Sequence, residues 1–284
     1  MKLDERAVLT QLNVSQPTMN KRDKRVSEQV AVSNNAVTQS GIYHKSLLPN
    51  NEHLRNVHKK TTLVRQFFYH NTLPWFGDGT MILPTKNYMT FMEGFTKLKS
   101  EWLQLVEKFL QEYPQLQLNA QRDLGSLYNA NEYPSVDELR LRFDMDMTIL
   151  PVPSNDFRVD IAEDELQHIQ QQVEQRVEQS TEMAMNEAWQ RLYDKVKHMA
   201  EKLSDIKNIF RDTLIENLVD VCDVLKRMNI TDDVDLENIR QQVETHLTKH
   251  NPESLRLDLD LRKQVSAKAN EIRKQIEEHM NDKR

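Results

Sequence analysis

The chain has 284 residues and a net charge of −6, with 38% hydrophobic and 29% charged side chains. This composition is typical of long amphipathic helices with one wet face. Five glycines are too few for many tight turns or phosphate-cradling loops, and with Cys222 as the only cysteine a disulfide framework and a cysteine-based zinc site are excluded within one chain.

The hydropathy of the sequence predicts neither a signal peptide nor a membrane-spanning segment. Its first residues lack the apolar run of a signal peptide, and no stretch of about eighteen apolar residues is present to span a bilayer. We therefore expect a protein without a membrane partner, in a reducing, cytoplasmic setting.

Charge is distributed unevenly along the chain. Residues 1–65 contain eleven Lys and Arg against five acids, a net charge of +6, so the remaining residues carry −12. The cluster Lys21, Arg22, Lys24 and Arg25 makes this end a candidate nucleic-acid contact. The alternative is a solvated polar arm, and the acidic remainder would repel a phosphate backbone.

Residues 1–50 are polar and weakly periodic, and they predict a basic, partly irregular amino-terminal arm. A short strand or helix near residues 7–14 and a helix near 24–34 are compatible with its pattern. Asn51 then suits the N-cap of a helix that reaches the aromatic cluster at 67–69.

The segment 70–84 cannot stay helical, because prolines and glycines interrupt it. Gly77, Asp78 and Gly79 predict a tight turn. The adjacent Trp75 and Phe76 either pin this turn onto the helices by apolar contact or belong to a recognition loop.

A helix over 86–113, ended by Pro114, is predicted next, followed by shorter helices over 115–128 and 135–142. The period then changes, because apolar and polar residues alternate over 143–149 and again over 157–161. These two strands predict a small antiparallel hairpin that packs on helices. Residues 51–161 therefore form a helical region with an aromatic loop and this hairpin.

Residues 162–284 predict a bundle of long helices. Apolar residues recur close to an eleven-residue period over 162–204, which favours a nearly straight helix on the order of 60 Å long. Helices over 206–228 and 236–247, the latter capped by Thr231 or Asp232, precede a last helix with apolar positions from Leu261 to Met280. The fold class is mostly α with a small β-hairpin, its long amphipathic helices forming an elongated bundle or a coiled-coil-like hairpin, within one chain or against a second copy.

The sequence offers no clear catalytic constellation. Acids cluster at the hairpin and just after it, where they could bind a divalent metal or do acid–base work, but a solvated strand face and a helix N-terminus also account for them. These acids are Asp144, Asp146, Asp156, Asp160, Glu163, Asp164 and Glu165. His246 and His250 have ligand spacing without a third ligand. We assign no catalytic residue, metal or cofactor and expect a protein that is not an enzyme.

Large aromatic side chains beside arginines mark two further patches, at 189–193 and 210–214. Such pairs serve either core packing or an interface anchor. Together with the aromatic loop they make up the candidate interface residues Trp75, Phe76, Trp189, Arg191, Tyr193, Phe210 and Arg211.

Seven segments carry a resemblance that extends over nearly the whole chain: 12–15 (LNVS), 47–49 (LLP), 69–75 (YHNTLPW), 82–84 (ILP), 156–160 (DFRVD), 189–193 (WQRLY) and 210–214 (FRDTL). They resemble an uncharacterised protein family of bacteriophages, prophages and integrative elements. Members of similar families are often encoded near a MoxR-like AAA+ ATPase and a von Willebrand A-domain protein.

The resemblance implies a non-enzymatic helical adaptor or scaffold of a phage or mobile-element assembly, with the ATPase as a candidate partner. Its location would be the host cell cytoplasm. The alternative is a nucleic-acid-associated accessory factor of phage replication or recombination, in line with the basic amino-terminal stretch.

Overall fold

The computed structural model describes residues 2–37, 39–77, 79–154, 162–205 and 207–282. The chain divides into two compact units built from separated segments. Unit 1 contains Met1–Gln11, Phe67–Glu93 and Thr148–Arg284, and unit 2 contains Leu12–Gln66 and Gly94–Met147. These units do not coincide with the three consecutive parts expected from the sequence. The prediction of a mostly helical chain is confirmed.

The β structure is larger than the single hairpin predicted. Four strands form one antiparallel sheet in the order β4-β5-β1-β6. They are β1 (Ala7–Ser15), β4 (Leu73–Pro74), β5 (Met81–Pro84) and β6 (Asp144–Pro151). The strand predicted over 143–149 is therefore confirmed, but its neighbour in the sheet is β1. The strand predicted over 157–161 lies outside the described residues.

The segment after the first long helix is a β-hairpin rather than an irregular loop. Leu73 pairs with Ile82, and the chain turns through Gly77 and Gly79, whose φ angles of +75° and +91° favour glycine. Trp75 is fully buried in the core of unit 1. This burial supports the interpretation that the aromatic pair pins the turn. Asp78 lies outside the described residues.

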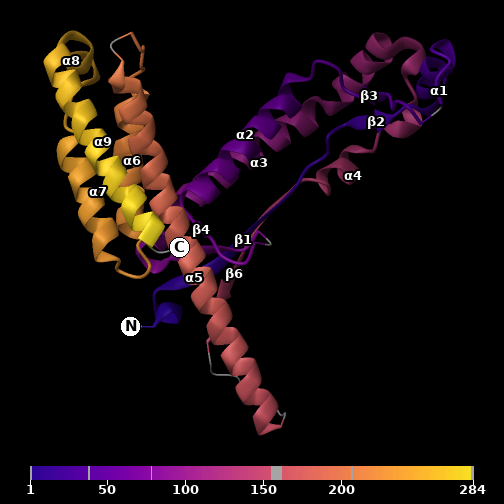
Figure 1. Ribbon diagram of the computed structural model, residues 1–284. Helices are drawn as coiled ribbons and strands as arrows, with labels where there is room; N and C mark the ends of the chain where they lie inside the picture. Colours follow the sequence, from indigo (N-terminus) through magenta and orange to yellow (C-terminus); the bar gives the residue numbers. More distant parts are fainter. Residues whose placement is uncertain (1, 38, 78, 155–161, 206, 283–284) are drawn as a thin grey trace. The chain divides into compact units, whose positions relative to one another are not determined.

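Unit 1 is built around the helix α5 (Glu163–Ser204). Helices α6 (Thr213–Met228), α7 (Val234–His246) and α9 (Leu259–Asp282) lie beside it (Figure 1), with the short α8 (Pro252–Leu257) before α9. The buried side chains of α5 run from Ser180 to Leu203 and face α6, α9 and β4. The long helix predicted over 162–204 is thus confirmed.

Several helix boundaries differ from the sequence prediction. Helix α6 begins at Thr213 rather than at 206, and Ile209, predicted on its apolar face, is 89% exposed. Ile206 lies outside the described residues. The cap of α7 is Asp233, whose carboxylate accepts the backbone N–H groups of Asp235 and Leu236, and not Thr231 or Asp232. Pro252 opens α8 instead of only ending the preceding helix, because a first helical position needs no N–H donor.

The buried Arg262 closes the carboxyl end of α5. Its guanidinium donates hydrogen bonds to the backbone carbonyls of Lys202 (3.0 Å), Leu203 (3.3 Å), Asp205 (2.6 Å) and Asn208 (2.9 Å). Helix ends leave such carbonyls without intrahelical partners. One side chain of α9 therefore satisfies both the end of α5 and the turn that follows it.

Unit 2 contains α1 (Lys24–Ser33), α4 (Val136–Arg140) and a two-stranded sheet of β2 (Asn20–Arg22) and β3 (His44–Ser46). Helices α2 (Glu52–His70) and α3 (Thr85–Leu124) contribute residues to both units. Short 3-10 turns lie at Leu3–Glu5, Gly125–Leu127 and Ala130–Glu132. The predicted N-cap Asn51 and the capping box of Ser135 and Glu138 are both confirmed.

Pro114 does not end the third helix, which corrects the division into helices over 86–113 and 115–128. An interior proline costs about 3 kcal/mol because it lacks the N–H donor and its ring crowds the preceding turn. Leu110, Tyr113 and Ala120 are nevertheless all buried on one face of α3. Burial raises the pKa of Tyr113 to about 12, and its hydroxyl donates to the Pro134 carbonyl. This packing outweighs the local preference of proline.

We predict that Arg262→Gln lowers the free energy of unfolding by about 3 kcal/mol, because it leaves buried carbonyls without donors. Urea denaturation measures the effect. Lys263→Gln is the matched control, since Lys263 is two-thirds exposed on the same helix. Equal changes in the two variants would show that Arg262 does not close the end of α5.

Candidate functional site around the middle of helix α5

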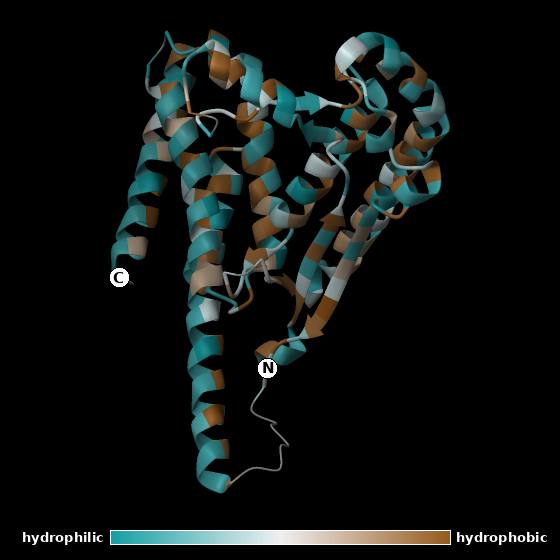
Figure 2. Ribbon diagram, turned by 90° about the vertical axis from the view of Figure 1, so that its right-hand side faces the viewer, coloured by the Kyte–Doolittle hydropathy of each residue, from teal (hydrophilic) through white to brown (hydrophobic). Residues whose placement is uncertain are grey.

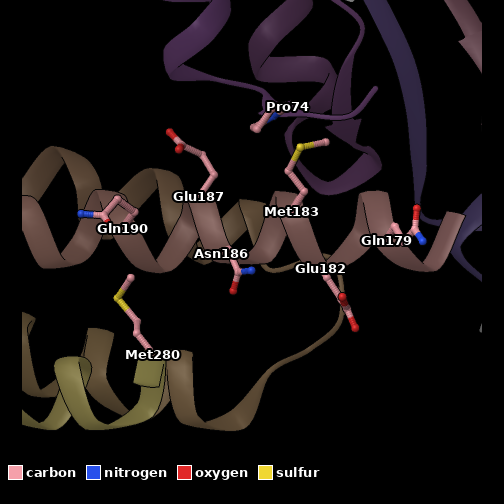
Figure 3. Close-up of a pocket in the computed structure, with 8 residues that line it drawn as sticks. All are labelled: Pro74, Gln179, Glu182, Met183, Asn186, Glu187, Gln190 and Met280. Atoms are coloured by element: carbon pink, nitrogen blue, oxygen red, sulfur yellow. The ribbon is translucent and has the colours of Figure 1, made fainter. Parts of the chain in front are cut away.

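An open hollow of about 460 Å³ lies along the middle of α5 in unit 1 (Figure 3). In Figure 3, Pro74 of β4 approaches Met183 on one side of the helix, and Met280 of α9 lies on the other side. The lining residues are Pro74, Gln179, Glu182, Met183, Asn186, Glu187, Gln190 and Met280. This lining contains no hydroxyl, thiol, imidazole or amine, and its ionisable groups are the carboxylates of Glu182 and Glu187.

The polar side chains of this hollow are tied to neighbours on the same helix. Glu187 accepts a hydrogen bond from Arg191 Nε at 2.9 Å, and the Gln190 amide donates to Asp194 at 2.7 Å. Arg191 also donates to the carbonyls of Tyr69 and His70 at the end of α2. Arg191 therefore acts as a tie between α5 and α2 within unit 1.

A second hollow of about 430 Å³ lies on α5 beside the loop that precedes α7. It is lined in part by Met185, Trp189, Thr231 and Asp233. The Trp189 indole N–H donates to Asp233 Oδ2 at 3.2 Å, and its ring stacks on His279 of α9 with the ring centroids 4.2 Å apart. Trp189 therefore lies between an acid of α7 and an imidazole of α9.

Asp233, which lines this second hollow, also lies close to Asp235 and His279. Each offers one ligand atom, and the three atoms lie within 4.8 Å of one another. The loop before α7 holds Asp233 in place through reciprocal 2.8 Å hydrogen bonds with Asn229. The sequence pattern does not reveal this group, because His279 lies far along the chain from the two acids. The local signal was two acids, 233 and 235, at a helix start.

The aromatic and arginine residues predicted as interface candidates occupy different surroundings in unit 1. Trp75 and Trp189 are in the core, and Trp75 contacts Phe76 with ring centroids 5.7 Å apart. Phe76 and Tyr193 pack partly buried against that core, and the Tyr193 hydroxyl donates to Glu277 at 2.7 Å.

The second predicted patch is split between a buried ring and an exposed charge. Phe210 is buried, with the guanidinium groups of Arg256 and Arg262 at 5.1 and 5.3 Å from its ring centroid. Arg211 is exposed. The structure therefore holds Phe210 by cation–π contacts, while Arg211 faces solvent.

The acid and histidine groups considered from the sequence do not converge on one point. Asp144 and Asp146 are on the exposed face of β6, and the three acids at 163–165 occupy the first turn of α5, as the pattern predicted. His250 Nε2 lies 3.2 Å from the His246 carbonyl oxygen, so that pair contacts its own backbone. Asp156 and Asp160 lie outside the described residues.

Cys222 is 2% exposed on α6, and burial raises the pKa of its thiol to about 12. A thiol of this kind stays protonated and unreactive near neutral pH. The position of Cys222 beside Val221 and Leu225 on an apolar face predicts such a buried thiol, and its burial is confirmed.

No protein-family model, curated protein or solved structure matches the chain. Among the described residues, none of the helices combines the length and the hydropathy needed to cross a bilayer.

Two carboxylates, those of Glu237 and Glu244, surround the buried Arg240 on α7. Their ionisation makes the stability of the fold depend on pH. Arg240 donates two 2.8 Å hydrogen bonds to Glu237 and one to Glu244. These bonds lower the pKa of Glu237 from 4.5 to about 2. Since the folded pKa lies below the unfolded one, the stabilisation is present above about pH 4.5 and is lost as the pH falls towards 2.

We predict that Glu237→Gln lowers the free energy of unfolding by about 1 kcal/mol at pH 7, since the carboxylate is one-third exposed and partly screened. Urea denaturation at pH 7, 4 and 3 should show the gap to the wild type narrowing as the solution becomes acidic. A gap that stays constant over this range would mean that the ionised Glu237 is not the source of the stabilisation.

Proposed function

We propose that the chain is a non-enzymatic helical adaptor that binds a protein partner along the amino-terminal half of α5. The observation that carries this proposal is the distribution of burial along that helix. Its buried residues all lie between Ser180 and Leu203, whereas none of residues 163–179 is buried. At 1.5 Å per residue this unburied half is about 25 Å long, enough for several turns of a partner helix.

The unburied half still carries an apolar stripe. Leu166, Ile169, Val173 and Val177 follow at steps of three and four residues, so they share one face, and each is only partly exposed. In Figure 2 this half of the helix is mainly teal, with brown confined to a narrow band. A narrow apolar stripe on an otherwise polar helix is the pattern of a helix that packs on one partner helix.

The acidic side chains on the amino-terminal half of α5 favour a partner with positive charge. Six acids and one basic residue, Arg176, lie within 163–182. Arg176 itself is placed over the Phe76 ring, 5.6 Å from its centroid. Two copies of this helix would bring like charges together, which disfavours self-pairing. We therefore propose that the occupant is an amphipathic helix with Lys and Arg beside its apolar stripe.

The resemblance stated above provides the biological setting for this proposal. It places the adaptor in a phage or mobile-element assembly, with a MoxR-like AAA+ ATPase as the first partner to test.

We predict that Ile169→Glu in the full chain weakens partner binding at least tenfold, because it places a charge in the apolar stripe. Gln171→Glu is the matched control, since it adds the same charge on the opposite face of the helix. Affinity of purified wild type and variants for the ATPase, or for a partner photo-crosslinked at position 173, is measured at 50 and 300 mM salt.

Binding that falls with salt and is lost only in Ile169→Glu supports the adaptor. Equal loss or equal retention in both variants contradicts it, as does a wild-type crosslink formed only to a second copy of the chain.

A second candidate function, nucleic-acid binding, rests on the β2–β3 hairpin of unit 2. Lys21, Arg22, Lys24 and Arg25 are all exposed, and the register sets Arg22 opposite His44. The N-cap Asp23 is the acid nearest Lys24 and Arg25, and it also lies 3.5 Å from Lys45 Nζ. This local concentration of positive charge is the feature that a phosphate backbone recognises.

We predict that, if the hairpin binds nucleic acid, Lys21→Glu/Lys24→Glu weakens binding to single- or double-stranded DNA about equally for all sequences and reduces its salt dependence. A salt-titrated gel shift measures both. Lys249→Glu serves as the control, since it removes an exposed lysine from unit 1. Absence of any wild-type shift at low salt would remove this function.

A further inference from the structure

We propose that Asp233, Asp235 and His279 form a binding site for a divalent transition-metal ion, with Zn²⁺ as the ion to test. The proposal is independent of the adaptor function. Its basis is a mixed set of two carboxylates and one imidazole brought together from the start of α7 and the end of α9.

The three ligand atoms lie near, but not at, the spacing that zinc requires. With bonds of about 2.0–2.2 Å in tetrahedral geometry, two ligand atoms on one ion lie about 3.4 Å apart. The three candidate ligand atoms lie within 4.8 Å of one another, and His279 Nδ1 lies 3.8 Å from Asp235 Oδ2. Binding therefore requires the side chains to draw together by up to about 1.4 Å, and Asp235 is exposed and so the least constrained of the three.

His279 has coordinating capacity that its surroundings leave unused. The side chain is 19% exposed, and its Nε2 is buried without a hydrogen-bond partner among the described residues. Its Nδ1 lies 3.8 Å from Asp235 Oδ2, beyond hydrogen-bond distance. Buried polar atoms are nearly always partnered, so the imidazole, with Nδ1 towards Asp235 and Nε2 without a partner, retains capacity for a ligand.

The residues around the three ligands fix their orientation. Asp233 Oδ1 accepts the backbone N–H groups of Asp235 (2.9 Å) and Leu236 (3.1 Å), while Oδ2 accepts the Trp189 indole N–H. The Trp189 ring stacks on the imidazole of His279. Outer contacts of this kind hold metal ligands in place in known sites.

The ligand types decide the class of ion. One nitrogen with two carboxylate oxygens suits Zn²⁺, Mn²⁺, Fe²⁺ or Co²⁺, whereas Mg²⁺ and Ca²⁺ prefer oxygen alone. A divalent cation would also offset the two negative charges. Of the three ligands, Asp233 also lines the hollow of about 430 Å³. Bound there, the ion would link the first turn of α7 to the end of α9.

The test is a titration of the purified full chain with Zn²⁺ by calorimetry and with Co²⁺ by visible absorption. We expect one equivalent to bind and the melting temperature to rise. Because Trp189 stacks on His279, bound Co²⁺ should quench tryptophan fluorescence, and Trp189→Phe should remove most of that quenching while Trp75 and Trp102 remain.

Asp235→Ala and His279→Gln should each weaken binding at least tenfold, whereas His246→Gln and His250→Gln should leave it unchanged. Asp235 is exposed, so its variant decides the question even if His279→Gln does not fold. The proposal is overturned if no stoichiometric binding occurs, or if Asp235→Ala binds as tightly as the wild type.

Discussion

The structure of unit 1 depends on burying one face of α5 between Ser180 and Leu203. This face carries Trp189, Leu192 and Val196, and none of these side chains is more than 1% exposed. Fully burying a large apolar side chain contributes about 1.5–3 kcal/mol, so the sum over such a face is large compared with the net stability of a domain. Helices α6 and α9 and the β4 strand supply the opposing surface. Each of these segments buries only part of the apolar face of α5. Packing on this one helix therefore holds the separated segments of unit 1 together.

At two helix ends, arginine side chains donate hydrogen bonds to the last backbone carbonyls, in a chain that contains few glycines. Helices often end on a glycine in the left-handed region, but this chain has five glycines and instead uses arginine donors. Arg191 donates to the last carbonyls of α2, and Arg262 donates to those of α5. Asn35 and Asn50 adopt the left-handed backbone that glycine would otherwise supply. These closures join segments far apart in the sequence, so local helix ends become part of the tertiary structure.

The parts of this structure that sequence reasoning predicted are those determined within one helical turn. The buried faces of α2, α5 and α9 follow from apolar spacing, and the capping box of α4 follows from Ser135 and Glu138. The pairing of β6 with β1 and the passage of α3 through Pro114 depend on partners distant in the chain, which periodicity does not contain. Sequence periodicity also does not reveal the group of Asp233, Asp235 and His279, because only the packing of α7 and α9 brings these residues together.

Helix α5 continues its apolar stripe beyond the part that the core covers. A helix without any partner gains nothing from aliphatic side chains at fixed spacing, and a solvated helix is normally polar all round. Leu166, Ile169 and Val173 nevertheless keep the register of the buried face, and Val177 joins them to the core. Leaving such residues partly exposed forfeits some of the stabilisation that full burial would give. The proposal of a basic partner helix rests on this stripe and on the acids beside it, which disfavour pairing with a second copy.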